Sequence, residues 1–222
     1  MSESSEAPEV SEPLEVTDRA GSLPVVSRHE RVVGAKWTVV TDRVLLDADT
    51  AVDRDVVVHP GAVGVVALDT DDRVVVLRQY RHPVAAHLWE IPAGLLDEPG
   101  ESPWSTAQRE LVEEAGLLAL KWHTLVDLYS SPGMSSETVR VYLARGLSDV
   151  DPADRPPRTD EERDLVVARV DLDALVQRVL AGHIHNSLAV AGLLAAAESR
   201  RGGWGSLLPP EHPWPGPSWA LG

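Results

Sequence analysis

The chain has 222 residues, 43% of them apolar and 25% charged, values typical of a globular protein that buries a core. Acidic residues outnumber basic ones 35 to 20, and the resulting net charge of −15 repels nucleic acid and anionic lipid. There is no cysteine, which excludes disulfides, thiolate catalysis, cysteine-ligated zinc and iron–sulfur clusters. No apolar run is long enough to cross a bilayer and no signal-peptide pattern opens the chain, so we expect a cytoplasmic protein.

Two regions precede the main domain. Residues 1–20 are rich in Ser, Glu and Pro with few large apolar groups, so we expect a disordered acidic tail there. Residues 21–60 are expected to form an N-terminal β-region, and residues 61–199 the main domain. Valine-rich or alternating patterns predict the first strands at Val25–Val33, Trp37–Leu46, Asp55–His59, Ala62–Asp69 and Arg73–Arg81.

The next segment contains the first helix signal. A short strand is predicted at Leu88–Ile91, and Pro92-Ala93-Gly94 is typical of a chain break. A helix is predicted over Ser102–Gly116, because this stretch has a serine cap, a proline at its first position and a glycine at its end.

The remainder of the chain adds strands and helices before a tail rich in Pro and Trp. Strands are predicted at Trp122–Leu128, Val139–Ala144 and Leu165–Val170, and helices at Asp173–Ala181 and Ser187–Ser199. This order predicts an α/β (α+β) fold in which a mixed β-sheet packs against helices. Residues 200–222 carry three Trp among Gly and Pro, and this tail either docks on the body or on a partner subunit, or is loosely ordered.

Acidic side chains crowd one arc of the predicted helix. On a helical wheel, Glu110, Glu113 and Glu114 fall within about 100°, opposite an expected core side of Trp104, Leu111, Val112 and Ala115. Like charges at this spacing repel, and the C-terminal half of a helix further disfavours negative charge. The arc is either a solvated acidic face or a place where divalent cations share the oxygens. The glycine-bearing loop that precedes the helix, and Arg109 beside the cluster, favour the cation site.

This segment resembles the Nudix box. The pattern is Gly, five residues, Glu, seven residues, then Arg-Glu-aliphatic-x-Glu-Glu-x-Gly-aliphatic, and the part from Glu101 to Leu117 fits it without exception. The spacing from Gly94 to Glu101 is one residue longer than the pattern, and the loop is expected to absorb it. We expect the Nudix fold, with the mixed sheet sandwiched between helices.

Neighbouring motifs are similar to those of bacterial ADP-ribose pyrophosphatases. These are Gln79-Tyr80-Arg81, the stretch from Trp89 to Asp97, and Pro132, which follows the box at the interval seen in that group. The resemblance covers about Gly34 to Ala197 and implies hydrolysis of ADP-ribose to AMP and ribose 5-phosphate. It also implies a homodimer in which the N-terminal β-region crosses to the partner.

The resemblance assigns the metal site to the box. Glu110 and Glu114 are the expected principal ligands of Mg²⁺, with Mn²⁺ as an alternative, and Glu113 joins through a bridging or water-mediated contact. The Ala93 carbonyl is the expected backbone ligand. Glu101 and Arg109 are expected to support the site rather than to react.

Base and substrate contacts are expected outside the box. By resemblance the general base is a glutamate on a later loop, with Glu162 favoured over Glu161, although both also fit a plain polar loop. Four groups are candidates for substrate contacts: Arg81 for phosphate, Glu90 for ribose hydroxyls, Trp37 for adenine, and Gly133 with Met134 in the segment around Pro132. A surface arginine, a strand-end acid and a core tryptophan are the structural alternatives for the first three.

Three functions compete. The first is the Mg²⁺-dependent ADP-ribose pyrophosphatase, and the second is the same chemistry on a nucleotide sugar, NADH or a dinucleoside polyphosphate, because specificity lies outside the box. The third is a non-catalytic module that senses a nucleotide. The box retains all its acidic positions, which favours an enzyme.

Overall fold

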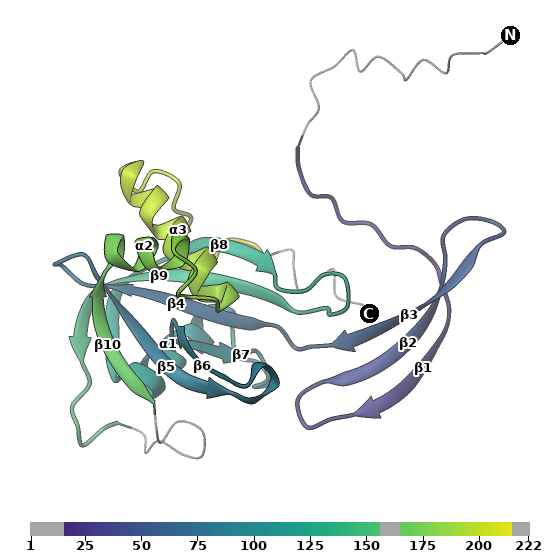
Figure 1. The fold of residues 1–222 in the computed structure, drawn as a ribbon, viewed down its shortest axis with the longest axis horizontal. Helices are drawn as coiled ribbons and strands as arrows, with labels where there is room; N and C mark the ends of the chain where they lie inside the picture. The colour runs from purple at the N-terminus through teal and green to yellow at the C-terminus, as the bar shows by residue number, and fades with distance from the viewer. Residues whose placement is uncertain (1–15, 156–164, 215–222) are drawn as a thin grey trace, which may run out of the picture.

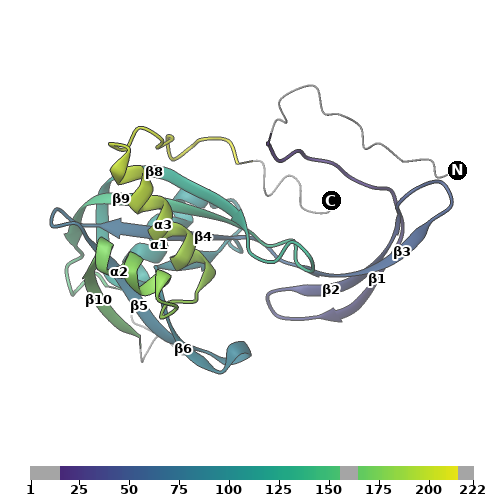
Figure 2. The same cartoon turned by 45° about the horizontal axis from the view of Figure 1, so that its top comes forward.

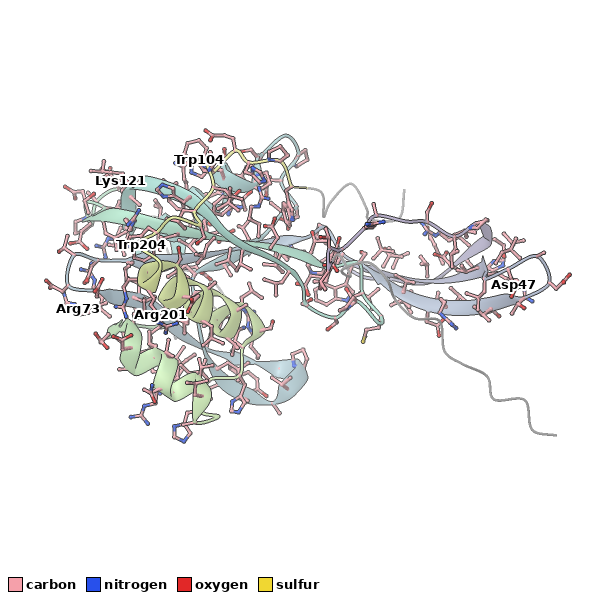
Figure 3. All side chains as sticks on the ribbon, turned by 90° about the horizontal axis from the view of Figure 1, so that it is seen from above. Asp47, Arg73, Trp104, Lys121, Arg201 and Trp204 are labelled. Atoms are coloured by element: carbon pink, nitrogen blue, oxygen red, sulfur yellow. The ribbon has the colours of Figure 1, made fainter. Side chains whose placement is uncertain are left out.

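The structure is a computed structural model that describes residues 16–155 and 165–214. Its N-terminal region is a three-stranded antiparallel sheet of β1 (Val25–Val33), β2 (Thr38–Leu45) and β3 (Ala51–Val58). This sheet stands away from the body of the molecule (Figure 1). Asp47, in the turn between β2 and β3, lies at its far end (Figure 3). The predicted strands of this region are confirmed to within a few residues.

The body is built on a seven-stranded mixed sheet, which confirms the predicted fold class. Five strands follow the order β10-β5-β4-β9-β8, while β6 pairs with β5 and β7 pairs with β4. Strands β4 and β9 run parallel, and the other pairs are antiparallel. The strands are β4 (Ala62–Leu68), β5 (Arg73–Arg81), β6 (Ala86–Glu90), β7 (Ala93–Leu95), β8 (Leu117–Tyr129), β9 (Thr138–Asp149) and β10 (Val166–Asp171).

Helices cover both faces of this sheet (Figure 2). Helix α1 (Pro103–Ala115) packs on one face, over a core that includes Val65, Leu111 and Tyr142. Helices α2 (Leu172–Leu180) and α3 (Ser187–Arg201) pack on the other, over a larger core. A short 3-10 turn, His82–Val84, joins β5 to β6. No helix in residues 16–155 or 165–214 has the length and apolar content that a membrane span requires.

The ends of α1 agree with the sequence, but its buried side does not. The Ser102 side chain accepts a hydrogen bond from the Ser105 amide at 3.1 Å, and Gly116 ends the helix with φ +63°. The buried residues of the helix are Thr106, Ala107, Glu110, Leu111 and Glu114, whereas Trp104, Val112 and Ala115 are half-buried. The expected core side is therefore rotated, and two of the three acidic residues lie on it.

The predicted break at Pro92-Ala93-Gly94 is wrong for its last two residues, which belong to strand β7. Ala93 and Gly94 pair with Gly64 and Val63 of the buried strand β4. The Pro92 carbonyl also accepts a hydrogen bond from the Val65 amide at 2.8 Å. Pairing with a distant strand thus overrides the local signal for a turn, and it places this segment beside α1.

The C-terminal tail docks on the body as far as the structure describes it. Helix α3 runs to Arg201, two residues beyond its predicted end, and Trp204 follows shortly after it (Figure 3). The guanidinium of Arg145 lies over the Trp204 ring, 4.7 Å from its centroid. Thr124 of β8 pairs with Leu208. Arg140 of β9 donates to the carbonyl of His212. Of the alternatives left open by the sequence, docking on the body holds for residues 202–214.

Candidate active site

The site begins where strand β7 meets the middle of α1. A Cβ atom placed on Gly94 would lie 2.0 Å from Oε1 and 2.1 Å from the carboxyl carbon of Glu110. No side chain fits in that space, so the glycine lets the carboxylate lie directly against the backbone of β7. Glu110 is 8% exposed in this position.

Glu114 reaches the same strand one turn further along the helix. Its carboxylate accepts a hydrogen bond from the Ala93 amide at 2.8 Å, and the residue is 6% exposed. Because residues four apart lie side by side on a helix, the two buried carboxylates of Glu110 and Glu114 both face β7. Burying two negative charges so close together is costly unless cations or donors compensate them.

Arg109 is the cation at the centre of the acidic cluster. Its guanidinium donates to Glu110 at 2.7 Å, to Glu113 at 2.9 Å and to Glu101 at 3.1 Å. Burial alone would lower the pKa of Arg109, but the hydrogen bond to Glu101 and the charges of Glu110 and Glu113 raise it. The bond from Arg109 in turn lowers the pKa of the Glu101 carboxyl. Glu101 therefore stays ionised and ties the loop before the helix to the helix itself.

The donor chemistry of this cluster fits a hard divalent cation. Among the contacts of the described residues, one guanidinium faces three carboxylates and Glu114 lies beside them. Glu110 and Glu114 offer oxygen donors, the type that Mg²⁺ prefers, and the Gly94 cradle holds one of them in place. Across the part of the chain that the structure describes, no three acidic or histidine side chains already surround a single point as ligands would.

Two predicted substrate residues contact each other. Arg81 binds the Glu90 carboxylate with two hydrogen bonds, of 2.9 and 2.7 Å. Glu90 of β6 lies opposite Leu77 of β5, so the Arg81 side chain extends back along its strand to reach it. Glu90 is 2% exposed, and Gln79 lies 3.4 Å from it. Glu90 is thus a buried partner of Arg81 rather than a free strand-end acid. Sequence reasoning assigned the two side chains separate tasks and did not anticipate the pair.

Trp37 lies in the turn between β1 and β2 of the N-terminal sheet and not in the core. Its side chain is 50% exposed, so the core interpretation is wrong. One face of its ring stacks on His59 with centroids 6.1 Å apart. The neighbouring Lys36 forms an ion pair with Asp97 in the loop before α1. This contact brings the turn that carries Trp37 to the loop that feeds the acidic helix.

The remaining candidates lie apart from the acidic cluster or outside the described residues. Gly133 and Met134 belong to the loop between β8 and β9, which contacts strand β3. The Met134 carbonyl accepts a hydrogen bond from the Val57 amide of β3 at 2.8 Å. The candidate bases Glu161 and Glu162 lie outside the described residues. Sequence reasoning missed Thr106, whose hydroxyl donates to Glu101 at 3.0 Å. Its position on the same side of the predicted helix as Arg109 was the available signal.

Comparisons with known proteins show which proteins this chain is similar to. The NUDIX domain family model matches residues 58–188. An ADP-ribose pyrophosphatase of Mycobacterium tuberculosis is 47% identical over 162 residues, which cover 73% of this chain and 77% of that protein. One of Bacillus subtilis is 33% identical over 162 residues, with 73% and 85% covered. A solved structure of an ADP compounds hydrolase has a TM-score of 0.70 at 21% identity and covers 84% of this chain and 98% of its own.

Proposed function

This chain belongs to the NUDIX family of hydrolases, and from that premise we propose that it hydrolyses the diphosphate of ADP-ribose to AMP and ribose 5-phosphate. One observation carries the proposal: two buried carboxylates of α1 lie against β7, Glu110 at a glycine that leaves no room for a side chain and Glu114 at the Ala93 amide. The relatives that are 47% and 33% identical, both named ADP-ribose pyrophosphatases, support the choice of substrate.

Glu110 and Glu114 would hold Mg²⁺ together with the carbonyl of Ala93, and Glu113 would contribute through water. Bound there, the cation would neutralise charge on the diphosphate and acidify a water molecule. Arg109 already pairs with Glu110 and Glu113, so part of its contact with them must yield when a cation binds. The ion pair of Arg109 with Glu101 would remain and keep helix α1 joined to the loop that precedes it.

The other groups bind substrate and move the proton. Arg81 is oriented by its two hydrogen bonds to Glu90, and its side chain, 41% exposed, would bind a phosphate of the substrate. Trp37, backed by His59, offers its exposed area to adenine. Gly133 and Met134 would complete the substrate pocket, and Glu162, or Glu161, would act as general base on the attacking water.

The N-terminal sheet supports a homodimer. Its first strand exposes Val25, Val26, Val32 and Val33, which are 42%, 59%, 59% and 71% exposed. Such an apolar strand on a sheet that stands away from the body is suited to a second copy of the chain. Light scattering on purified protein is expected to give twice the chain mass, and a monomer at micromolar concentration would remove this part of the proposal.

The decisive experiment is a substrate panel. The purified protein is incubated with Mg²⁺ and with ADP-ribose, a nucleotide sugar, NADH or a dinucleoside polyphosphate, and the products are separated by chromatography. We expect AMP and ribose 5-phosphate from ADP-ribose at the highest kcat/KM, and no product after chelation of the metal. Faster cleavage of another compound would change the substrate, whereas no cleavage of any would indicate a sensing module.

A second measurement separates the two candidate bases. Glu162→Gln is expected to lower kcat at least ~100-fold with little change in KM, because a general base acts in the transition state. Glu161→Gln is the matched control and is expected to stay within a few-fold of the parent. The reverse result would assign the base to Glu161.

A further inference from the structure

A pocket lies on the face of the sheet opposite the acidic cluster. It has a volume of about 320 Å³ and lies between α2, the loop that follows it, and strands β5, β6 and β10. Side chains alternate between the two faces of a strand, so Trp89 points toward this pocket while its neighbour Glu90 pairs with Arg81 on the other face. The pocket is therefore separate from the proposed active site.

The floor of the pocket is apolar. Val76, Leu175 and Ile184 are 2%, 4% and 6% exposed, and Val170 and the Trp89 indole complete the lining. A volume of this size is at the lower end of the ~300–1,000 Å³ typical of small-molecule sites. Water gains few hydrogen bonds on such a surface, so an apolar or aromatic group is the favoured occupant.

The rim of the pocket is cationic. Helix α2 ends in a turn in which Gly182 has φ +69°, and the His183 amide donates back to the Arg178 carbonyl at 2.9 Å. This turn places the His183 ring beside the Arg178 guanidinium, with Nδ1 and Nη1 3.4 Å apart. Two nitrogen-bearing side chains thus converge at one edge of an apolar pocket.

The charge at this rim has no carboxylate partner among the described residues. Arg28, Arg81, Arg109, Arg140 and Arg200, by contrast, all form ion pairs with carboxylates. Within residues 16–155 and 165–214, no carboxylate lies within ion-pair distance of Arg178, or of Arg78, whose guanidinium lies over the Trp89 ring at 5.5 Å. Among the described residues, the positive charge of Arg178 at the edge of the pocket therefore has no carboxylate to balance it, which makes this edge complementary to an anion.

We propose that this pocket binds a small amphiphilic anion, with an apolar or aromatic body on the floor and one carboxylate or phosphate at Arg178 and His183. The guanidinium can meet either anion with two parallel hydrogen bonds. The site goes beyond the proposed hydrolysis, because none of its residues belongs to the acidic cluster or to the Arg81–Glu90 pair.

The proposal is tested with four probes that separate the body from the charge: 1-naphthoate, 1-naphthyl phosphate, the neutral 1-naphthalenemethanol, and acetate. Binding to the full chain is measured by calorimetry and by saturation-transfer NMR. We expect at least one naphthyl anion to bind about tenfold or more tightly than the neutral compound, and acetate to show no binding. The preferred anion identifies carboxylate or phosphate as the natural group.

Variants locate the binding. Arg178→Gln is expected to weaken binding of the preferred anion about tenfold, the usual effect of losing a charge-assisted hydrogen bond. Arg201→Gln removes an equally charged, exposed side chain at the end of α3 and is expected to leave the affinity unchanged. Both variants should hydrolyse ADP-ribose at the parent rate, so a failure here is distinct from a failure of the proposed function.

Three results would overturn the proposal. The first is equal affinity for the neutral and anionic naphthyl probes, and the second is unchanged affinity in Arg178→Gln. The third is displacement of the bound probe by saturating AMP with Mg²⁺, which would place the probe in the active site.

Discussion

Arg109 and Arg140 are both partly or fully buried arginines on the α1 side of the sheet, yet their surroundings differ in charge balance. Arg109 is shared by the carboxylates of Glu101, Glu110 and Glu113, and its side chain is 30% exposed. Arg140 is 2% exposed and meets one carboxylate, Asp127, through two bonds of 2.7 Å. Carbonyl groups of the C-terminal tail and the ring of Trp214 complete its contacts.

The difference separates a site prepared for a ligand from a structural contact. Around Arg140 one positive charge meets one negative charge, and the remaining donors are satisfied by backbone carbonyls, so nothing further is required. Around Arg109, among the described residues, three carboxylates share one guanidinium, and carboxylates crowded in this way are stabilised when a cation binds between them. The imbalance, rather than the presence of an ion pair, identifies the functional region.

The largest effect is expected from removing one charge of the unbalanced cluster. Glu114→Gln keeps an oxygen that can accept from the Ala93 amide but removes the charge that a cation needs. We expect kcat/KM for ADP-ribose to fall about 10²- to 10³-fold, because metal-ion catalysis supplies several kcal/mol. The free energy of unfolding without metal should change by less than about 1 kcal/mol, since the hydrogen bond is retained.

Steady-state kinetics over a range of Mg²⁺ concentrations measure this effect. Glu198→Gln is the matched control, because that carboxylate is exposed on α3. A Glu114→Gln variant with the parent kcat/KM would show that the charge excess around Arg109 has no catalytic role.

Arg140→Leu should have the opposite profile, with a large loss of stability. The substitution leaves Asp127 without its partner and the tail carbonyls without donors. Removing one partner of a buried pair costs about 3–5 kcal/mol, and because Asp127 is 35% exposed we expect about 2–4 kcal/mol. Arg43→Leu, which breaks the exposed Arg43–Asp53 pair, is expected to cost less than about 0.5 kcal/mol.

Denaturant unfolding of both variants measures these costs. If Arg140→Leu unfolded at the same denaturant concentration as Arg43→Leu, the docking of the tail would contribute no stability.

Gly94→Ala perturbs the unbalanced cluster without changing any charge. The added Cβ would lie 2.0 Å from Glu110 Oε1, so either the carboxylate or strand β7 must move. We expect kcat/KM to fall about 10- to 100-fold, as for a misplaced catalytic group. Gly21→Ala is the control, since a Cβ there meets nothing within 4 Å. Full activity in Gly94→Ala would mean that the position of Glu110 is not fixed by β7.

The features around Arg109 that depend on local sequence pattern were predicted from the sequence. The cap at Ser102, the αL glycine at Gly116 and the spacing of the acids around Arg109 all lie within one short segment. Strands β1 and β5 also have the predicted ends, because their alternating or valine-rich patterns stop at turn residues. Local periodicity is sufficient where an element's limits are set by its own residues.

Contacts between distant segments could not be predicted in this way. Arg140 lies in a strand pattern that gives no sign of its bonds to residues 212 and 213. The rotation of α1 that buries Glu110 depends on β7, which forms only because β4 is available to pair. Likewise, the register of β5 and β6 places Glu90 opposite Leu77, so the Arg81 side chain must extend back along β5 to reach it, which the sequence of neither strand indicates. Each of these outcomes is fixed by packing, which one segment's sequence does not contain.

Ser102→Ala tests whether the N-terminal cap of α1 positions the acidic cluster. The hydroxyl accepts from the Ser105 amide, and losing such a cap costs about 1 kcal/mol. We expect that loss in the free energy of unfolding, measured with denaturant, and less than a twofold change in kcat. A much larger fall in kcat would indicate that the cap, and not only the charge excess, positions the cluster.

The smallest effect is expected from the pH dependence of the free energy of unfolding. It concerns Arg28, which pairs with one carboxylate, Asp42, as Arg140 pairs with Asp127. The bond from Arg28 holds the pKa of the buried Asp42 carboxyl below its ordinary 3.8, against the opposing effect of burial. A carboxyl whose pKa is lower in the folded state than in the unfolded state stabilises the fold at pH values above the unfolded-state pKa. This stabilisation is lost as the pH falls through the folded-state pKa. The contribution of Asp42 should therefore be constant above about pH 5 and decline below pH 3.8.

Unfolding of the parent and of Asp42→Asn from pH 7 to pH 3 isolates this contribution. The difference between their free energies of unfolding should shrink only in the most acidic part of the range, because the amide does not titrate. A difference that shrinks already between pH 7 and pH 5 would mean that the Asp42 carboxyl titrates above its ordinary value. Burial would then outweigh the bond from Arg28, and balanced pairing would not protect a charge in this fold.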